Sequence, residues 1–257
     1  MRGIIIKDDK RYWHTENFLE GKGHMFFTVN EVAEGLDFVI FPFAEAVDEK
    51  TYGHNFFSTL KKDVLIFSGI RSKYLTYMCE KFNLQYHVLL ENEVVAAKNA
   101  VPTSEGVIAY LITNLHITIA KSRVLIVGYG ICGRDLARRL KGLEAHVCAL
   151  VRNEEKARVA KTAGVEAVFL HQFDESEWDI IINTVEGAVL PQESLENRYG
   201  TLFIDIASKP HGFDMKQVRR LNPASALLSG IPGKYAVKTA GEILGEFIHD
   251  ILKGGVL

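Results

Sequence analysis

The chain contains few cysteines, which argues against both a disulfide scaffold and a metal site. Its 257 residues include three cysteines, Cys79, Cys132 and Cys148, and none of them has the paired spacing of a metal-binding motif. An odd number of scattered cysteines is typical of a protein whose thiols stay reduced. We therefore expect no metal ion and no structural disulfide.

The chain also lacks a surplus of charge of either sign and any apolar run of membrane-spanning length. Its net charge is −2 and its pI is about 6.5, so electrostatics give no reason to expect a nucleic acid or a membrane as partner. We recognise no signal peptide either. These absences predict a soluble, cytoplasmic protein. The 47% hydrophobic content is sufficient for one large domain or two small ones.

Short β-prone segments alternate with helical ones along the chain, which is the pattern of a parallel sheet covered by helices. A first series predicts strands at residues 3–6, 25–29, 38–41, 64–67 and 85–88. A second series predicts strands at residues 123–127, 146–151, 167–169, 180–183, 202–205 and 226–228. We predict an α/β fold with two Rossmann-like, doubly wound parallel-sheet domains that are bridged by two long helices.

The two bridging helices are predicted from long apolar stretches outside the strand series. The first covers residues 103–119, with Thr103 or Ser104 as its N-cap and Glu105 just inside. The second begins at Val237 and packs back on the first domain. The expected division is a substrate domain at 1–102, completed by the helix at 237–257, and a dinucleotide domain at 120–236. A ligand is expected in the cleft between them.

The most informative motif is the sequence RVLIVGYGICG at residues 123–133. A buried strand runs into Gly128-x-Gly130-x-x-Gly133, and an amphipathic helix follows. In such a loop the first glycine permits a tight turn, the second lets the backbone approach a pyrophosphate, and the third allows close packing of the helix. The motif predicts a bound dinucleotide. For Cys132 inside the loop, a small filler and a reactive thiol are both open interpretations.

The end of the next strand indicates which dinucleotide is bound. Enzymes that use NAD place an acid about twenty residues beyond the first glycine, whereas those that use NADP place a cation there. The position reads Val151-Arg152-Asn153, and the nearest acids, Glu154 and Glu155, come later. Arg152 suits a phosphate because its guanidinium is planar and permanently charged. We predict NADP(H), with a solvated surface arginine as the alternative interpretation.

Polar and small residues follow several predicted strands, where ligands of parallel sheets bind. The first domain contributes Ser68 after its fourth strand. The second contributes Thr184, then Ala207, Ser208 and Lys209 after Asp205, and finally the segment at 230–233. Each of them could instead shape a turn or cap a helix.

Five motifs, taken in order, resemble the A subunits of dipicolinate synthase. They are FSGI at 67–70, NAVPTSEG at 99–106, the glycine loop, DIAS at 205–208, and GIPG at 230–233 with KTAG at 238–241. The resemblance runs from about Val64 to the C-terminus. Members of the family carry Arg-Thr at the position of Ile131-Cys132, an Arg-Pro-Gly-Gly run where this chain begins with Lys209, and Pro at the position of Val237. These departures bear on cofactor affinity and on the identity of the substrate.

The resemblance implies an NADP-dependent oxidation of a dihydrodipicolinate-type precursor to dipicolinate, as in the mother cell of a spore-forming bacterium. Such a dicarboxylate substrate requires cations, hydroxyls and a proton acceptor, so the candidate catalytic residues are Ser68, Glu105, Ser208, Lys209 and Lys238. The residues expected at the cofactor are Gly128, Tyr129, Gly130, Ile131, Cys132, Gly133, Arg152, Asn153, Thr184, Ala207, Pro232 and Thr239. Glu105 could equally be a helix-capping residue, and the lysines could be solvated.

The resemblance also implies a flavoprotein-like B subunit, and we expect a homodimer or larger oligomer. Two alternatives stay open at this point. One is a dehydrogenase of the 2-hydroxyacid or alanine type, although the sequence shows no convincing pair of His and carboxylate for it. The other is a protein that senses NADP(H) without turning it over.

Overall fold

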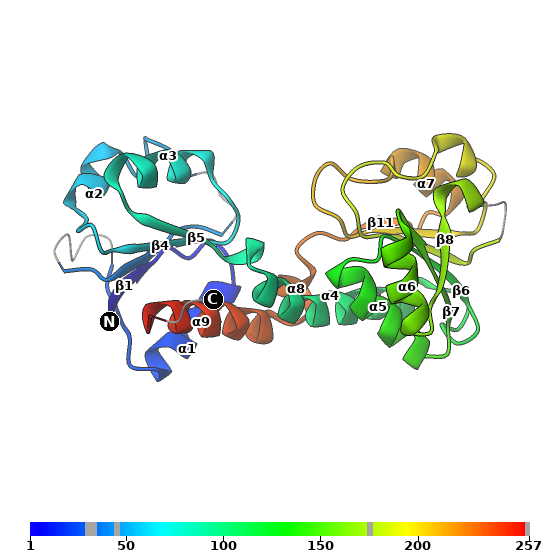
Figure 1. Cartoon of the computed structure of the whole chain (residues 1–257), viewed down its shortest axis with the longest axis horizontal. Helices are drawn as coiled ribbons and strands as arrows, with labels where there is room; N and C mark the ends of the chain where they lie inside the picture. The colour runs from blue at the N-terminus through cyan, green and yellow to red at the C-terminus, as the bar shows by residue number, and fades with distance from the viewer. Residues whose placement is uncertain (29–34, 44–46, 174–176, 255–257) are drawn as a thin grey trace. The chain divides into compact units, whose positions relative to one another are not determined.

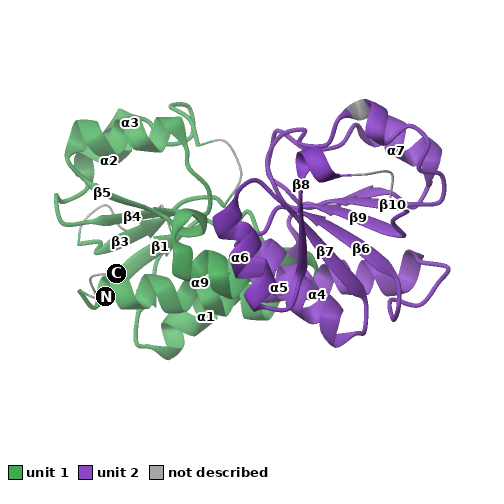
Figure 2. Ribbon diagram, turned by 45° about the vertical axis from the view of Figure 1, so that its right-hand side comes forward, with its two compact units in different colours: residues 1–99, 232–257 green, residues 100–231 purple. Residues whose placement is uncertain are grey.

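The computed structural model describes residues 1–28, 35–43, 47–173 and 177–254. The chain divides into two compact units, with residues 1–99 and 232–257 in unit 1 and residues 100–231 in unit 2 (Figure 2). Each unit has its own parallel sheet. The predicted class, two α/β domains with Rossmann-like parallel sheets, is confirmed.

Unit 1 contains a five-stranded parallel sheet in the order β2-β1-β3-β4-β5. Helices α1 and α9 cover one face of this sheet, and α2 and α3 cover the other (Figure 1). Side chains of β3 alternate between the two cores, because successive residues of a strand point to opposite faces: Phe38 and Ile40 pack under α1 and α9, and Val39 packs under α2 and α3. The elements are β1 Arg2–Ile5, α1 Arg11–Gly21, β2 Met25–Phe26, β3 Phe38–Ile40, α2 His54–Thr59, β4 Leu65–Ser68, α3 Lys73–Phe82, β5 Gln85–Val88, the 3-10 turn Leu89–Glu91 and α9 Val237–Leu252.

Unit 2 contains a six-stranded parallel sheet in the order β11-β10-β9-β6-β7-β8. Strand order reverses beside β6, which makes the carboxyl end of β6 the point where a doubly wound sheet binds its ligand. Helices α4, α5 and α6 contribute to the core on one face, and α7 contributes to the core on the other. The elements are β6 Arg123–Val127, α5 Ile131–Gly142, β7 His146–Val151, α6 Glu154–Thr162, β8 Glu166–Phe169, β9 Ile180–Asn183, β10 Leu202–Asp205, α7 Met215–Leu221, β11 Ala226–Leu227, and the 3-10 turns Leu170–Gln172 and Gln192–Ser194.

The first long helix differs from its prediction. Helix α4 spans Glu93–Asn114, so the expected range of 103–119 is wrong at both ends. Asn92 precedes the helix and its Oδ1 accepts from the backbone N–H groups of Val94 and Val95 at 2.9 and 3.2 Å. Pro102 lies inside the helix rather than before it, and Thr103 is therefore no N-cap. The boundary between the two units also falls within α4.

The second crossing between the units is made by the short helix α8, Ile231–Tyr235, rather than by a long one. The expectation of two long bridging helices therefore holds only for α4. Helix α9 begins at Val237, as predicted, and it lies wholly in unit 1. It packs closely on α1 because Gly241 and Gly245 face that helix: a Cβ on Gly241 would stand 2.3 Å from the carbonyl oxygen of Arg11. No helix among the described residues has the length and apolarity needed to cross a membrane.

Candidate functional site

The three glycines of the loop after β6 each meet a separate steric requirement. Gly128 has φ +94°, and a Cβ there would stand 2.3 Å from Val185. A Cβ on Gly133 would stand 2.4 Å from the carbonyl oxygen of Gly128, so only glycine lets α5 start this close to the strand. A Cβ on Gly130 would meet no atom within 4 Å. The space over Gly130 is open, as close approach of a pyrophosphate requires.

The loop is held by a hydroxyl from the neighbouring strand. Thr184 follows β9, and its Oγ1 donates to the carbonyl oxygen of Val127 at 2.9 Å. Tyr129 is buried, which raises the pKa of its phenol. Ile131 and Cys132 form the first turn of α5, and burial raises the pKa of the Cys132 thiol. Thr184 therefore supports the loop, and burial disfavours the thiolate form of Cys132.

A cavity of about 810 Å³ lies at the carboxyl ends of β6, β7 and β8. Its lining combines apolar side chains with three basic ones, Arg152, Lys156 and His171, and one acid, Glu186. The other lining residues are Val127, Gly128, Tyr129, Gly130, Leu150, Val151, Phe169, Leu170, Val185 and Val189. Such a position, with the glycine loop at one wall, fits the adenosine end of a dinucleotide.

Arg152 is exposed at the end of β7, and it makes no hydrogen bond or ion pair with any other described residue. Asn153 caps α6, because its Oδ1 accepts from the backbone N–H of Lys156 at 3.0 Å. Glu154 and Glu155 are exposed in the first turn of α6 and do not line the cavity. The strand end therefore presents a cation, and the acids that follow it in sequence, Glu154 and Glu155, are not on the cavity wall.

The loop after β10 is organised by a carboxylate that the sequence placed at a strand end. Asp205 is fully buried and accepts hydrogen bonds from Asn183 Nδ2 at 3.0 Å and from the backbone N–H groups of Ala207 at 3.0 Å and Gly212 at 2.7 Å. Its role is to shape the loop. Ser208 and Lys209 lie exposed at the tip, free to meet a ligand.

In unit 1, Ser68 is the last residue of β4 and is buried. Its Oγ donates to the carbonyl oxygen of Ile70 at 2.7 Å, so it must accept from the hydroxyl of Tyr86 at 2.6 Å. Tyr86 accepts in turn from the backbone N–H of Ser72 at 3.2 Å. This chain of hydrogen bonds fixes the turn after β4, the role that the sequence left open for Ser68 as the alternative to a site residue.

The other predicted catalytic residues lie on helices. Glu105 lies in the middle of α4 rather than in a first turn, and it forms an ion pair with Arg139 at 3.1 Å. Its expected capping position is therefore wrong, because the helix begins twelve residues earlier. Lys238 and Thr239 are exposed in the first turn of α9, where the Lys238 Nζ is 3.9 Å from Glu242. Pro232 is half-buried in α8.

Only some of the predicted residues thus lie at one cavity. Gly128, Tyr129, Gly130 and Arg152 line one cavity of unit 2. Ser68, Pro232, Lys238 and Thr239 belong to unit 1, while Glu105, Ala207, Ser208 and Lys209 belong to unit 2. Their joint action on one substrate stays a prediction. The sequence missed Lys156 and His171, whose only signal was their place after β7 and β8.

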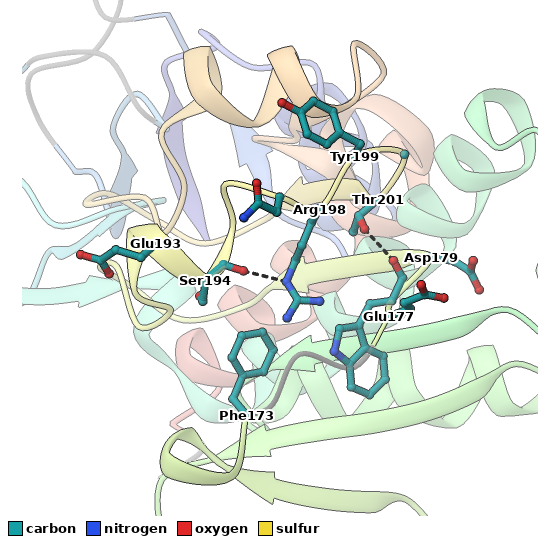
Figure 3. Close-up of a pocket in the computed structure, with 11 residues that line it drawn as sticks. Phe173, Glu177, Asp179, Glu193, Ser194, Arg198, Tyr199 and Thr201 are labelled. Carbon is teal, nitrogen blue, oxygen red and sulfur yellow. Dashed lines mark hydrogen bonds between the residues drawn. The ribbon is translucent and has the colours of Figure 1, made fainter.

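A larger cavity, of about 960 Å³, opens at the amino ends of β9 and β10 (Figure 3). Arg198 lies over the ring of Phe173, 4.8 Å from its centroid, and its Nε donates to the carbonyl oxygen of Ser194 at 2.7 Å. Three acids, Glu177, Asp179 and Glu193, also line the cavity. It contains none of the predicted site residues, and it lies at the edge of the sheet where parallel α/β folds do not bind dinucleotides.

No cluster of three or more His, Cys, Asp or Glu side chains suited to a metal ion occurs within the described ranges. The three cysteines are free thiols.

Comparison with known proteins gives both sequence relatives and solved structures. No family model matches the chain. The A subunit of dipicolinate synthase from Bacillus subtilis is 33% identical over 193 residues, which cover 73% of this chain. The aligned part spans 64% of the length of that relative. A crystal structure of dipicolinate synthase, A chain, from Bacillus subtilis superposes with a TM-score of 0.89 over 99% of this chain and 96% of its own, at 25% identity.

Dehydrogenases have a similar fold. The apo-structure of D-lactate dehydrogenase from Escherichia coli superposes with a TM-score of 0.64 over 100% of this chain and 98% of its own. At 15% identity this likeness shows the fold alone.

Proposed function

This chain belongs to the family of the A subunits of dipicolinate synthase, and we propose that it is an NADP-dependent oxidoreductase that makes dipicolinate from a dihydrodipicolinate-type precursor. The proposal rests on the family and on the cavity at the glycine loop. The observation that carries it is the joint lining of that cavity by Gly128, Gly130 and Arg152.

The dehydrogenase-like fold implies a nicotinamide cofactor, and the residues present fit one. The open space over Gly130 suits the pyrophosphate, and the apolar walls suit the adenosine. Arg152 and Lys156 supply positive charge at the end where the 2′-phosphate of NADP would lie, and His171 lines the same cavity. When bound, the nicotinamide ring supplies the hydride chemistry. We therefore propose NADP(H) rather than NAD.

Oxidation of the precursor removes a hydride and a proton, and the product ring becomes aromatic. The substrate is a dianion, so its carboxylates need cations. We assign Lys209 and Lys238 to charge balance and Ser208 to orientation, all three being exposed. Glu105 is the candidate proton acceptor, although its pairing with Arg139 weakens that assignment. The buried Ser68 would act by holding the turn after β4.

Because the relative is named as one subunit of a synthase, we propose that a second, flavoprotein-like subunit completes the enzyme. We also propose a homodimer or larger, and a place in the cytoplasm of the mother cell of a spore-forming bacterium. These are inferences from the family.

The test is the ultraviolet absorbance of dipicolinate formed from a dihydrodipicolinate precursor and NADP⁺, with the purified chain alone and with a flavoprotein partner. We expect NADPH binding by the chain alone, little product alone, and product at a much higher rate with the partner. Full-rate synthesis by the chain alone would remove the partner from the proposal. Tight NADPH binding without product in either mixture would favour a sensing role, and reduction of 2-oxoacids would favour a D-lactate dehydrogenase-type enzyme.

A further inference from the structure

Two histidines meet inside unit 1, away from the cavity and from every residue assigned above. His24 follows the end of α1 and His249 lies in the last turns of α9. Their exposed fractions are 7% and 8%. The Nε2 atom of His24 and the Nδ1 atom of His249 are 2.9 Å apart, and they share one hydrogen bond. The pair joins two segments separated by 225 residues of sequence.

The geometry limits how many protons the pair can hold. One nitrogen of a shared hydrogen bond must donate and the other must accept. His249 can take an extra proton on Nε2 while its Nδ1–H donates to His24. A second proton on His24 would place N–H groups on both sides of the bond and break it. The Nδ1 atom of His24 is also buried, with no hydrogen-bond partner among the described residues.

The surroundings oppose charge on either ring. The Phe38 ring packs against the His24 ring in a T-shaped arrangement, with the two centroids 5.8 Å apart. Burial, the amino group of Met1, His249 and Lys253 lower the pKa of His24, and only Asp37 opposes them. Burial, Lys253 and Lys22 lower the pKa of His249, and only Asp250 opposes them.

We propose that the His24–His249 pair is an acid-sensitive latch, which holds the last turns of α9 against the end of α1 while the rings are neutral and releases them when both are protonated. The inference does not rest on the proposed function. The rest of α9 is held by buried apolar side chains such as Ile243 and Leu244, which do not titrate. Release is therefore confined to the turns around His249.

The direction of the pH effect follows from the lowered pKa values. Above pH 6.5, the ordinary pKa of histidine, both rings are neutral whether α9 is held against α1 (closed) or released (open), so the latch has its full strength. Below 6.5 the open state takes up protons that the closed state refuses. With two protons taken up, the equilibrium constant for opening rises by up to about 100-fold for each unit of pH.

Hydrogen exchange of the amides of residues 247–252 in the full chain, corrected for the intrinsic rate, tests the latch between pH 5.5 and 7.5. We expect opening to increase as the pH falls below 6.5 in the wild type and not in the double variant His24→Gln and His249→Gln, because amides bind no proton in this range. The control His116→Gln removes an exposed histidine of unit 2 and should behave like the wild type. The same pH slope in the wild type and in the double variant would overturn the proposal.

A second measurement covers the case in which the double variant does not fold. Proton NMR of the histidine rings in the wild type should show both rings titrating below pH 6.5. Ordinary titration of both rings near pH 6.5 in the folded chain would overturn the latch.

Discussion

Arg152 is the residue that separates the two nicotinamide cofactors in our proposal. It is exposed, lines the cavity and makes no hydrogen bond or ion pair within the described part of the chain. We expect Arg152→Ala to weaken NADPH binding by about 1.5–3 kcal/mol, the contribution of a hydrogen bond to a charged group. NADH binding should be almost unchanged.

Titration of both cofactors by fluorescence or calorimetry measures this difference. Arg158→Ala is the matched control, because Arg158 is an exposed arginine of α6 that does not line the cavity. Equal losses of affinity for NADPH and NADH would show that Arg152 does not contact the 2′-phosphate.

A second prediction at the residue scale concerns the thiols. Burial raises the pKa of Cys79 to about 12, and burial also raises the pKa of Cys132. Since the thiolate is the reactive form, both should alkylate slowly at pH 8. Mass spectrometry after iodoacetamide treatment should find Cys79 unmodified in the folded chain and modified after unfolding. Rapid modification of Cys79 in the folded chain would contradict its burial.

At the scale of elements, the contact between α1 and α9 depends on glycine. A Cβ on Gly241 would stand 2.3 Å from the carbonyl oxygen of Arg11, and backbone cannot yield as a side chain can. We expect Gly241→Ala to lower the free energy of unfolding by about 1–3 kcal/mol, the usual cost of overpacking. Urea unfolding measures it.

Gly21, at the end of α1, provides the control for that substitution. A Cβ there would meet no atom within 4 Å. Gly21→Ala should leave the protein as stable or stabilise it by up to about 1 kcal/mol, because alanine restricts the unfolded chain. A similar change in stability in both variants would show that the contact with α1 does not govern the effect at Gly241.

The sequence predicted the inner strands well and the helix boundaries less well. Strands β6, β7, β9 and β10 have the predicted bounds, because central parallel strands are continuous apolar runs. The edge strand β2 ends at Phe26, earlier than predicted, since it pairs on one side only. The start of α4 was misplaced because Pro102, Thr103 and Ser104 form a convincing start signal. In the structure the helix nevertheless continues through these three residues, because its tertiary packing outweighs the local signal.

The same contrast holds for the candidate site. The glycine loop and Arg152 could be found because their roles depend on local sequence, a turn and a strand end. Lys156 and His171 reach the cavity from α6 and from the end of β8, so only the fold places them beside Arg152. A turn-shaping role for Ser68 was one of the two interpretations that the sequence left open, but its contact with Tyr86 could not be predicted, since that contact depends on the pairing of β4 with β5.

At the scale of the whole molecule, the proposed substrate residues are divided between the units. Lys238 and Ser68 belong to unit 1, and Lys209 and Ser208 belong to unit 2, whereas the cavity at the glycine loop belongs to unit 2 alone. Because no described residue of unit 1 lines the cavity at the glycine loop, a change in unit 1 should affect the cofactor far less than the proposed substrate.

Lys238→Met tests that division. Lys238 has an exposed side chain. Its ion pair with Glu242, at 3.9 Å, is open to solvent, so its loss should leave the free energy of unfolding almost unchanged. We expect the substrate concentration for half-maximal rate to rise by at least about tenfold, the equivalent of about 1.4 kcal/mol, while the NADPH dissociation constant stays the same. Lys253→Met changes another exposed lysine, the one that follows α9, and should leave both constants unaltered. If instead NADPH binding weakens and the substrate concentration for half-maximal rate stays the same, Lys238 belongs with the cofactor, and the dianion must be held by Lys209 and its neighbours in unit 2.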